Sequence, residues 1–154
     1  MLVDKNIKKL CIENNLITDF SLDKLNSNSY DVSIDKFIIN NEEISCEEYC
    51  LSSFDFVYVK VKECLNMPDN LCCMVIEKNS LMRMGLKVDG PLYQPGHKTN
   101  VYIRVFNISK SDIVLRCNMS VAQLVFFELN EVPMITYDKQ KNSHYNDENK
   151  FRIY

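Results

Sequence analysis

The apolar positions near the start of the chain follow a helical period. Between Asp4 and Asn14 the apolar side chains include Ile7, Leu10 and Cys11, which are spaced three and one residues apart. This spacing places them on one face of an α-helix, and Asp is a residue type that caps helix N-termini. We therefore predict a short amphipathic helix over Asp4–Asn14 with Asp4 as its cap.

From Tyr30 onward the pattern changes to short segments rich in Val, Ile, Tyr and Phe, which are typical of a β-sandwich or barrel. The segment VYVKVK (57–62) alternates apolar and charged residues, which predicts a strand with one solvated face. The segment VAQLVFF (121–127) is apolar almost throughout, which predicts a strand covered on both faces. The predicted strands include Val32, Ile34, Phe54 to Val61, Cys72 to Ile76, Val101 to Val105, Ile113 to Leu115 and Val121 to Phe127.

Turns and loops are expected where Gly, Pro, Asn, Asp and Ser gather. The sequence has such breaks at MPDN (67–70), VDGPLYQPGHKTN (88–100) and ISKSD (108–112). The tail over 137–154 is polar and dense in Asn and Lys, so composition alone predicts a frayed terminus. No repeat of fixed period interrupts this organisation.

Length and composition indicate one globular domain over residues 1–154. Apolar residues make up 46% of the chain and charged residues 25%, while three Gly and four Pro leave little room for a linker. No apolar run approaches the roughly 20 residues of a membrane helix, and the start MLVDKNIKKL lacks the apolar core of a secretion signal. We expect a cytoplasmic protein that does not enter a membrane.

Charge and cysteine content exclude some function classes. The formal net charge is −3, whereas proteins that bind DNA or RNA usually have a concentrated basic surface, so nucleic acids are not expected partners. A small phosphorylated ligand is compatible with this charge, because it needs only a few local cations and donors. The seven cysteines form no CxxC pair, and adjacent Cys72 and Cys73 would face opposite sides of a strand. We predict no metal site and interpret the thiols as reduced core residues.

Five segments in chain order resemble segments of the dCTP deaminase family. The family's starting helix resembles MLVDKNIKKLCIENNLI, and its Ser-x-Tyr-Asp strand resembles LNSNSYDVSI. Its Pro-containing turn, strand and Arg-Ser-Ser-Leu-x-Arg-x-Gly-Leu motif resemble MPDNLCCMVIEKNSLMRMGL. Its Asp-Pro-Gly-aromatic-x-Gly strand resembles YQPGHKTNVYIRVFN, and its Gly-Met-x-Ile-x-Gln-Leu strand resembles NMSVAQLVFF. The order and spacing of the five segments are more specific than any one of them.

The resemblance implies a fold, an assembly and a ligand. It implies a mostly β protein, a β-clip or distorted barrel like that of dUTPases, with a short N-terminal helix. It also implies a homotrimer with sites between subunits, a deoxypyrimidine nucleoside triphosphate as ligand, and Mg²⁺ carried on the ligand's phosphates. The Gly-rich C-terminal motif of dUTPases is absent from this sequence, which favours the deaminase side of the comparison.

The resemblance also implies which residues would contact a nucleotide. Lys78, Ser80 and Arg83 match family positions that bind phosphates, and cations with hydrogen-bond donors are what a triphosphate needs. Asn79 replaces the first Ser of the motif but still donates through its amide. The alternative interpretation is that these are solvated charges and a turn residue. The full predicted set is Lys78, Asn79, Ser80, Arg83, Gln123, Tyr137, Lys141, His144 and Tyr145.

The positions that resemble the family's catalytic ones are altered. The family's proton-transferring Glu lies three residues before the Asn that ends the strand, and here that position holds Arg104, which cannot act as a base. Gln94 stands where the family has Asp before Pro-Gly. His97, at the family's aromatic position, could titrate near neutrality and replace the base, or could be a stacked or solvated ring. Thr99 and Asn118 stand at family Gly positions, so strain is expected at Thr99 if its φ is positive.

The tail and one strand carry further departures. Tyr137, His144 and Tyr145 resemble the family's Tyr followed by Lys-Tyr-x-x-Gln, an element that folds over the bound triphosphate. His144 replaces the Lys and Glu148 replaces the Gln, and a carboxylate beside phosphates is unfavourable unless a cation such as Lys141 or Arg152 intervenes. Asp31 matches the family strand; it is interpreted as either a ligand contact or an acceptor of backbone hydrogen bonds.

Three functional hypotheses follow. The first is a nucleotide-binding protein of nucleotide metabolism whose deaminase activity is impaired or lost, because Arg104 replaces the general base. The second is an active dCTP deaminase that uses another acid/base group, such as Glu63 or Glu77; a dUTPase-like hydrolase is opposed by Gln94 and by the missing Gly-rich tail. The third is a trimeric regulatory scaffold that binds a protein partner.

Overall fold

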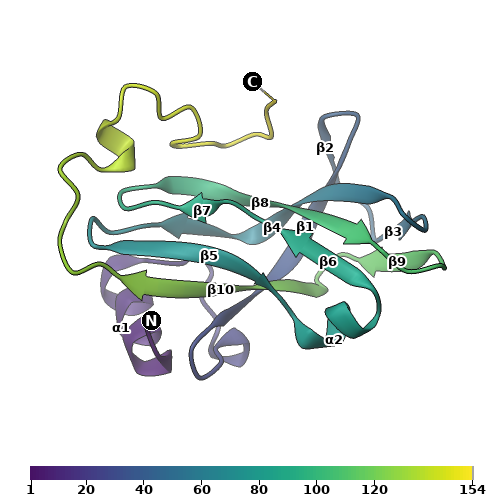
Figure 1. The fold of residues 1–154 in the computed structure, drawn as a ribbon, viewed down its shortest axis with the longest axis horizontal. Helices are drawn as coiled ribbons and strands as arrows, with labels where there is room; N and C mark the ends of the chain where they lie inside the picture. Colours follow the sequence, from purple (N-terminus) through teal and green to yellow (C-terminus); the bar gives the residue numbers. More distant parts are fainter. Residues whose placement is uncertain (154) are drawn as a thin grey trace.

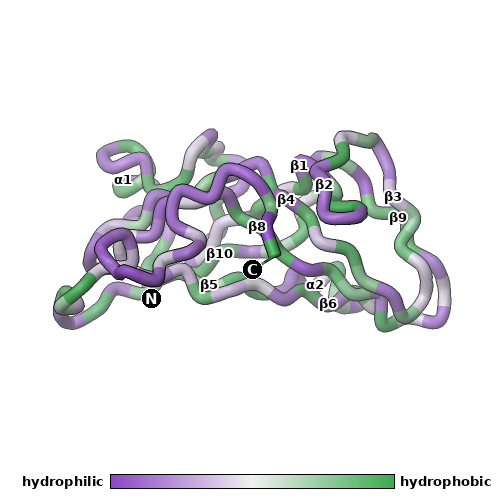
Figure 2. The backbone as a smooth tube through the Cα atoms, turned by 90° about the horizontal axis from the view of Figure 1, so that it is seen from above, coloured by the Kyte–Doolittle hydropathy of each residue, from purple (hydrophilic) through white to green (hydrophobic). Residues whose placement is uncertain are grey.

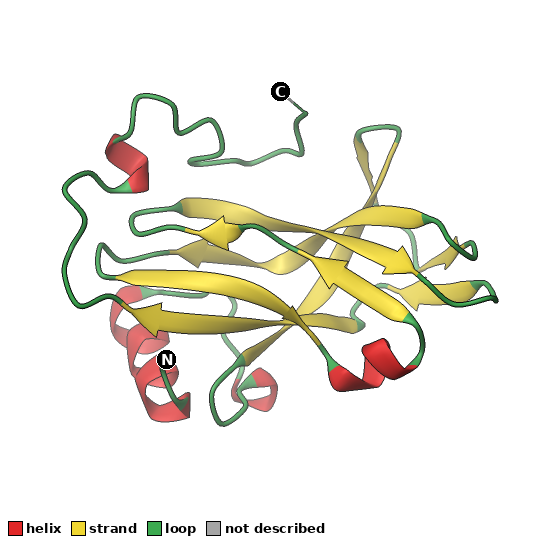
Figure 3. Ribbon diagram, in the orientation of Figure 1, coloured by secondary structure: helices red, strands yellow, loops and turns green. Residues whose placement is uncertain are grey.

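The computed structural model describes residues 1–153 of the 154-residue chain. Strands dominate it, as Figure 3 shows. The helices and 3-10 turns are α1 (Asp4–Asn14), η1 (Leu22–Lys24), α2 (Asn79–Arg83) and η2 (Tyr137–Lys139). The strands are β1 (Tyr30–Ile39), β2 (Glu42–Ile44), β3 (Glu48–Leu51), β4 (Phe56–Asn66), β5 (Leu71–Glu77), β6 (Leu86–Asp89), β7 (Leu92–Tyr93), β8 (Lys98–Asn107), β9 (Ile113–Arg116) and β10 (Ser120–Glu128).

The main sheet is antiparallel and curled, with the strand order β6-β8-β4-β1-β10-β5-β7 (Figure 1). Strand β1 connects its two halves, because its start pairs with β10 and its later part pairs with β4 and the β2 hairpin. The register shifts at Val32/Ser33 and again between Ile34 and Lys36, and such bulges bend a strand and increase its twist. The predicted mostly β, distorted-barrel fold with one short N-terminal helix is confirmed.

Helix α1 has the predicted bounds, but its predicted cap is wrong. The N-cap is Val3, whose backbone is extended, and Asp4 is already helical. The chain is fixed just before the helix because the Leu2 N–H donates to the Phe126 carbonyl of β10, at 2.8 Å. Asp4 instead accepts a hydrogen bond from the adjacent Lys5 N–H. The helix buries Ile7 and Cys11 against the sheet.

The core lies between the two halves of the curled sheet. In β4 the side chains of Val57, Val59 and Val61 are buried and alternate with more exposed residues, as the VYVKVK pattern predicts. Strand β10 is covered on both faces over most of its length, with Leu124 and Phe126 fully buried. Hydrophobic segments are concentrated in the strands, whereas the C-terminal tail is mainly hydrophilic (Figure 2).

Several predicted boundaries differ from the structure. The fourth strand begins at Phe56, because Phe54 has a positive φ of 60° in the turn before it. The segment 88–100, predicted as a loop, contains the end of β6, all of β7 and the start of β8. The short strands β2 and β3 were not predicted either. The equally short β9 was predicted because it begins with three apolar residues, whereas β2 (EEI) and β3 (EYCL) have neither an apolar run nor a clear alternation.

The two residues at family Gly positions differ in backbone conformation. Thr99 lies in β8 and has no positive φ, so the expected strain is absent there, whereas Asn118 is left-handed with a φ of 68°.

All seven cysteines are free thiols, and Cys73 is buried while Cys72 is partly exposed on the opposite face. Within residues 1–153, no helix is long and apolar enough to cross a membrane.

Candidate functional site

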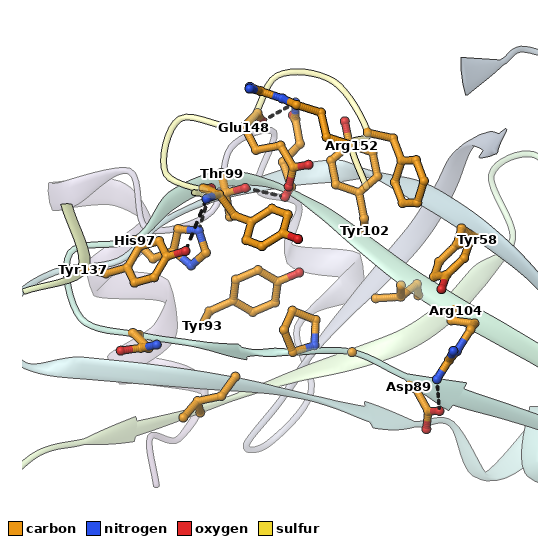
Figure 4. A pocket seen from close by; sticks show the side chains of 18 of the residues that line it. Tyr58, Asp89, Tyr93, His97, Thr99, Tyr102, Arg104, Tyr137, Glu148 and Arg152 are labelled. Carbon is orange, nitrogen blue, oxygen red and sulfur yellow. Dashed lines mark hydrogen bonds and ion pairs between the residues drawn. The ribbon is translucent and has the colours of Figure 1, made fainter. Parts of the chain in front are cut away.

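A pocket forms where β8 changes its neighbour. Strand β6 pairs with β8 as far as Asp89 opposite Arg104, and the chain then leaves through Gly90 and Pro91 to form β7, which pairs with β5. At the other end of β8 the tail takes over, with Glu148 bridged to Thr99. The gap is a pocket of about 650 Å³ (Figure 4). It is lined by Tyr58, Asp89, Gly90, Pro91, Leu92, Tyr93, Gln94, His97, Thr99, Asn100, Tyr102, Ile103, Arg104, Tyr137, Tyr145, Glu148, Phe151, Arg152 and Ile153.

One end of the pocket is an ion pair between directly opposed residues of β6 and β8. Arg104 Nη2 lies 3.2 Å from an Asp89 carboxylate oxygen, and each side chain is 38% exposed (Figure 4). The guanidinium carbon also lies 4.6 Å from the centroid of the Phe106 ring, and 5.7 and 5.8 Å from those of Phe56 and Tyr58. Arg104 is therefore held by a carboxylate and by aromatic faces, both of which favour a cation.

Two tyrosines, the buried Tyr93 and the partly buried Tyr102, line the pocket. The Tyr102 hydroxyl donates to Glu43 at 2.7 Å, and the Tyr102 backbone N–H donates to the Tyr93 hydroxyl. Burial raises the pKa of both phenols well above their usual value near 10, and for Tyr102 the neighbouring Glu43 carboxylate raises it further. Both hydroxyls therefore stay neutral at ordinary pH.

His97 is a buried, stacked ring. It is 6% exposed and lies between Tyr93 and Tyr137, with ring centroids 5.6 and 4.2 Å away. Its Nε2 is 2.9 Å from the Tyr145 carbonyl oxygen, which can only accept, so Nε2 carries the hydrogen. Burial lowers the pKa of His97 below 6.5, so it is neutral near pH 7. Within residues 1–153, its Nδ1 has no hydrogen-bond partner.

The tail packs over the pocket rather than fraying as its composition predicts. The Tyr137 N–H donates to the Pro95 carbonyl at 2.8 Å. Gly96, with a φ of 79°, permits this contact, because a Cβ there would lie 2.4 Å from an Asp138 oxygen and 2.9 Å from Thr136 Cβ. Further along, the Asp147 N–H donates to the Lys98 carbonyl. In Figure 1 the tail runs alongside the edge of β8 that β6 leaves open.

Glu148 is the most deeply buried carboxylate of the pocket. It is 8% exposed, and its backbone carbonyl accepts from both the N–H and the side-chain amide of Asn100, at 3.2 and 3.0 Å. Burial raises the pKa of its carboxyl group, Arg152 opposes this shift, and Glu43 adds to it. A carboxylic acid with a raised pKa in a cleft is a feature typical of functional sites.

The residues predicted to bind phosphates form a separate cluster beside α2. Lys78 makes an ion pair with Asp31, which also accepts from Gln123 Nε2 at 3.2 Å and Asn26 Nδ2 at 2.9 Å. Asp31 thus accepts side-chain donors rather than the backbone donors that were considered. The Arg83 side chain donates to Asn79 at 3.2 Å. Within the described chain, none of Lys78, Asn79, Ser80, Arg83 and Gln123 lines the pocket.

The structure thus divides the predicted site residues into two groups. Those in the pocket are Gln94, His97, Arg104, Tyr137 and Tyr145, together with Glu148 and Arg152. Lys141 and His144 belong to the tail but are not among the lining residues. The sequence interpretation missed Asp89, Tyr58, Tyr93, Tyr102 and Phe151. A sequence signal existed for Tyr102 alone, because it lies two residues before Arg104 and therefore on the same face of the predicted strand.

The two carboxylates suggested as replacement bases lie outside the pocket. Glu63 is 1% exposed and is held by Lys24 Nζ at 2.5 Å and by the Ser33 N–H at 3.1 Å. Glu77 is exposed on β5. Among residues 1–153 of one copy, Asp89 and Glu148 are the carboxylates that line the pocket.

The family model for dCTP deaminase-like proteins matches residues 32–129. The chain therefore belongs to the dCTP deaminase-like family.

Curated relatives agree with this assignment. A dCTP deaminase of Wigglesworthia glossinidia brevipalpis is 31% identical over 100 residues, which are 64% of this chain and 51% of that protein. A protein of Halobacterium salinarum named dCTP deaminase, dUMP-forming, is 30% identical over 103 residues, 66% and 53% of the two chains. A dCTP deaminase of Herpetosiphon aurantiacus is 28% identical over 89 residues, 58% and 48%. The chain thus spans about half the length of these relatives.

Solved structures share the fold. The 2′-deoxycytidine 5′-triphosphate deaminase of Agrobacterium tumefaciens superposes with a TM-score of 0.68 at 16% identity, covering 81% of this chain and 47% of that one. A dUTPase of phage phi11 of S. aureus superposes with a TM-score of 0.58 at 12% identity, covering 79% and 90%. At these identities the likeness concerns the fold, and it confirms the dUTPase-like architecture.

Proposed function

We propose that the chain binds a deoxypyrimidine nucleoside triphosphate in this pocket and that its deaminase turnover is absent or very slow. The observation that carries the proposal is Arg104, which lines the pocket, forms an ion pair with Asp89 and lies against three aromatic rings. It stands at the position that resembles the family's proton-transferring Glu. The ligand class is taken from the relatives, which are named dCTP deaminases.

The chemistry of deamination explains why Arg104 matters. Hydrolytic loss of the cytosine amine needs a group that takes a proton from water and delivers protons to the ring nitrogen and the leaving amine. An Arg guanidinium, with a pKa above about 12, remains protonated and has no acceptor. Gln94 is a neutral amide and cannot act as a base. His97 is neutral and its Nδ1 has no partner within residues 1–153, so this atom could accept a proton, but burial disfavours the imidazolium that would result. The family's carboxylate base therefore has no equivalent at these three positions.

Binding of a triphosphate requires more than one copy of the chain. The pocket contains Arg104 and Arg152, but the predicted phosphate residues beside α2 lie outside it. A homotrimer that brings the α2 cluster of one copy to the pocket of the next would complete the site, and it belongs to the proposal. The exposed apolar side chains of Met74, Ile76 and Leu92 on neighbouring β5 and β7 supply a surface that such a contact would cover.

Magnesium is proposed to enter with the ligand. Within residues 1–153, no group of three or more His, Cys, Asp or Glu side chains is arranged to hold a metal ion. The phosphate oxygens would therefore supply most of the oxygen ligands that Mg²⁺ prefers, and the ion would lower the negative charge brought to the site. The cytoplasmic location expected from the sequence is part of the same proposal.

The test is purified protein with dCTP and Mg²⁺, followed for dUTP and ammonia, beside a thermal-shift screen of pyrimidine nucleotides. A nucleotide-dependent shift without product supports the proposal. Robust turnover overturns it. No shift and no turnover would also overturn it, and would favour the protein-binding scaffold.

A second candidate, an active deaminase, is favoured by one observation. Asp89 brings a carboxylate into the pocket directly across from Arg104, so the acidic group has an alternative source on the neighbouring strand. If Asp89 acts as the base, turnover is present in the unmodified protein and is lost in Asp89→Asn. The impaired enzyme predicts no turnover in either.

A further inference from the structure

Glu148 has a position in the pocket that fits a role in ligand selection. Its backbone is fixed, because Asn100 of β8 donates twice to its carbonyl oxygen, and the neighbouring Asp147 N–H is bound by Lys98. The residue as a whole is 8% exposed, whereas the side chains of Asp89 and Arg104 are each 38% exposed. Figure 4 shows Glu148 among the side chains that line the pocket, on the segment of the tail that these hydrogen bonds attach to β8.

The charged and titratable groups around Glu148 come from four elements. The tail itself supplies Arg152, the β2 hairpin supplies Glu43, and β7 and β8 supply Tyr93 and Tyr102. The two phenols stay neutral, while Arg152 favours a charged Glu148 and Glu43 disfavours it. Burial has the largest effect and raises the pKa of Glu148.

Building on the nucleotide-binding function proposed above, we propose that Glu148 is a specificity-determining residue that admits an anionic nucleotide only when its carboxyl group is protonated. The carboxylate form repels phosphate in a buried site, where screening by water is weak. The neutral acid has one O–H donor and can bind a phosphate or carbonyl oxygen. Gln has nearly the same shape and stays neutral, so Glu148→Gln mimics the protonated state.

The proposal has a definite proton balance. Above the pKa of the free carboxyl group, each nucleotide bound takes up one proton from solvent, which ends on the Glu148 carboxyl group. Affinity of the unmodified protein should then fall by about tenfold for each pH unit in that range, as linkage requires for one proton. An uncharged nucleoside brings no phosphate, so its binding should change much less.

The experiment compares the full chain with Glu148→Gln by calorimetric titration of dUTP and dCTP in Mg²⁺ over a pH series that starts near the ordinary Glu pKa of about 4.3 and runs to about pH 8. The matched control is Glu128→Gln, because Glu128 is exposed at the end of β10 and loses the same charge. Deoxyuridine is the uncharged probe. All three proteins retain His97 and Glu43, so their titrations cancel in the comparison.

The expected result is that Glu148→Gln binds both triphosphates with little pH dependence beyond that of the phosphates, and at least about tenfold more tightly than the unmodified protein at the upper pH. Glu128→Gln should follow the unmodified protein. Parallel pH profiles for all three proteins would overturn the role of Glu148 while leaving nucleotide binding intact. Binding by none of them at any pH would overturn the proposed function itself.

Proton uptake gives a readout that needs no variant. Titrations of the unmodified protein in two buffers of different ionisation enthalpy measure the protons taken up on binding. Uptake near one proton per triphosphate at the upper pH, with uptake lost in Glu148→Gln, supports the proposal. Zero uptake by the unmodified protein over the whole pH range overturns it, even if Glu148→Gln does not fold.

Discussion

The cluster beside α2 and the pocket under the tail differ in how they depart from the family. The α2 cluster has Ser80 and Arg83 where the resembling phosphate motif has Ser and Arg, and its two changes, Lys78 for Arg and Asn79 for Ser, keep a cation and a hydrogen-bond donor. Asp31 forms an ion pair with Lys78. In the pocket, Arg104, Gln94 and Glu148 stand at positions that resemble the family's catalytic Glu, loop Asp and tail Gln, and each has a different chemical character from the residue it replaces. Phosphate binding tolerates any suitable arrangement of cations and donors. Proton transfer requires a group that can both accept and donate a proton. A single substitution therefore affects proton transfer in the pocket more than phosphate binding by the α2 cluster.

The changes in the pocket are also compensated locally. Arg104 brings a positive charge to β8, and Asp89 on the directly opposed position of β6 balances it. Opposite charges in a cross-strand pair are favourable, whereas like charges are destabilising. The ion pair between Asp89 and Arg104 therefore stabilises the sheet whether or not the pocket carries out proton transfer.

The largest effect is expected from reversing the cross-strand pair. The double variant Asp89→Arg with Arg104→Glu places a carboxylate at position 104. It keeps an ion pair between the two strands, with the positive charge now on β6 and the negative charge on β8. If the remainder of the pocket is intact, dCTP turnover should rise by up to about 10²- to 10⁴-fold, the usual contribution of a general base. The measurement is ammonia release under saturating dCTP.

The single variant Arg104→Glu is the control for stability. It sets two carboxylates opposite each other and removes the contacts with Phe106, so it should lose about 1 kcal/mol of unfolding free energy. The double variant should recover most of this loss in urea denaturation. Retained nucleotide binding with no gain of turnover in the double variant would show that residue 104 does not limit the reaction.

The next effect concerns the α2 cluster. Lys78→Ala should weaken triphosphate binding by about ten- to a hundredfold, because a hydrogen bond to a charged group contributes about 1.5–3 kcal/mol. Binding of the uncharged nucleoside should change little. Lys110→Ala, which removes a cation from the exposed turn before β9, is the control in calorimetric titration. Equal losses for both variants would mean that the α2 cluster is not the phosphate site.

A smaller effect is expected where the tail meets the loop. Gly96→Ala introduces a Cβ at a φ of 79°, where it would approach Thr136 and Asp138. Strain of this kind costs about 1–3 kcal/mol, and it should be relieved by release of the tail. Limited proteolysis at Lys139 and Lys141 should become faster while the thermal midpoint of the sheet changes little. Unchanged cleavage rates would contradict the tight contact.

The smallest effect is the pH dependence that His97 gives to folding. Its pKa in the folded chain lies below the 6.5 of the exposed residue, so the unfolded chain binds more protons as the pH falls. The stability that neutral His97 contributes is complete above pH 6.5 and is lost progressively below it. His97→Phe retains a stacked ring and should show a shallower loss between about pH 7 and 5 in urea denaturation. Parallel curves for the two proteins would contradict a buried neutral His97.

Much of the fold could be predicted because its signals are local. The apolar period of α1, the alternation in β4 and the apolar run of β10 each specify their own element, and the structure contains all three. Strands β6 (LKVD) and β7 (LY) could not be predicted, because they are short and lack the apolar run that marks the equally short β9. Their existence depends on pairing with β8 and β5, which are distant in the sequence.

Only some of the pocket residues could be predicted from the sequence. Gln94, His97, Arg104, Tyr137 and Tyr145 were found because they lie in recognisable segments, and the structure brings them to one pocket. Asp89 was missed because its importance comes from a cross-strand partner 15 residues away. The separation of the α2 cluster from the pocket is a property of the three-dimensional arrangement, which no linear pattern contains.

The most direct test of the account is a single-turnover experiment with the protein in excess over labelled dCTP and with Mg²⁺ present. One sample then reports both the fraction of nucleotide bound and the fraction converted. We predict that the label is bound and remains dCTP over a period in which an active deaminase would complete many turnovers. Conversion of the bound label to dUTP would contradict the central claim that Arg104 has removed the proton-transfer function from this pocket.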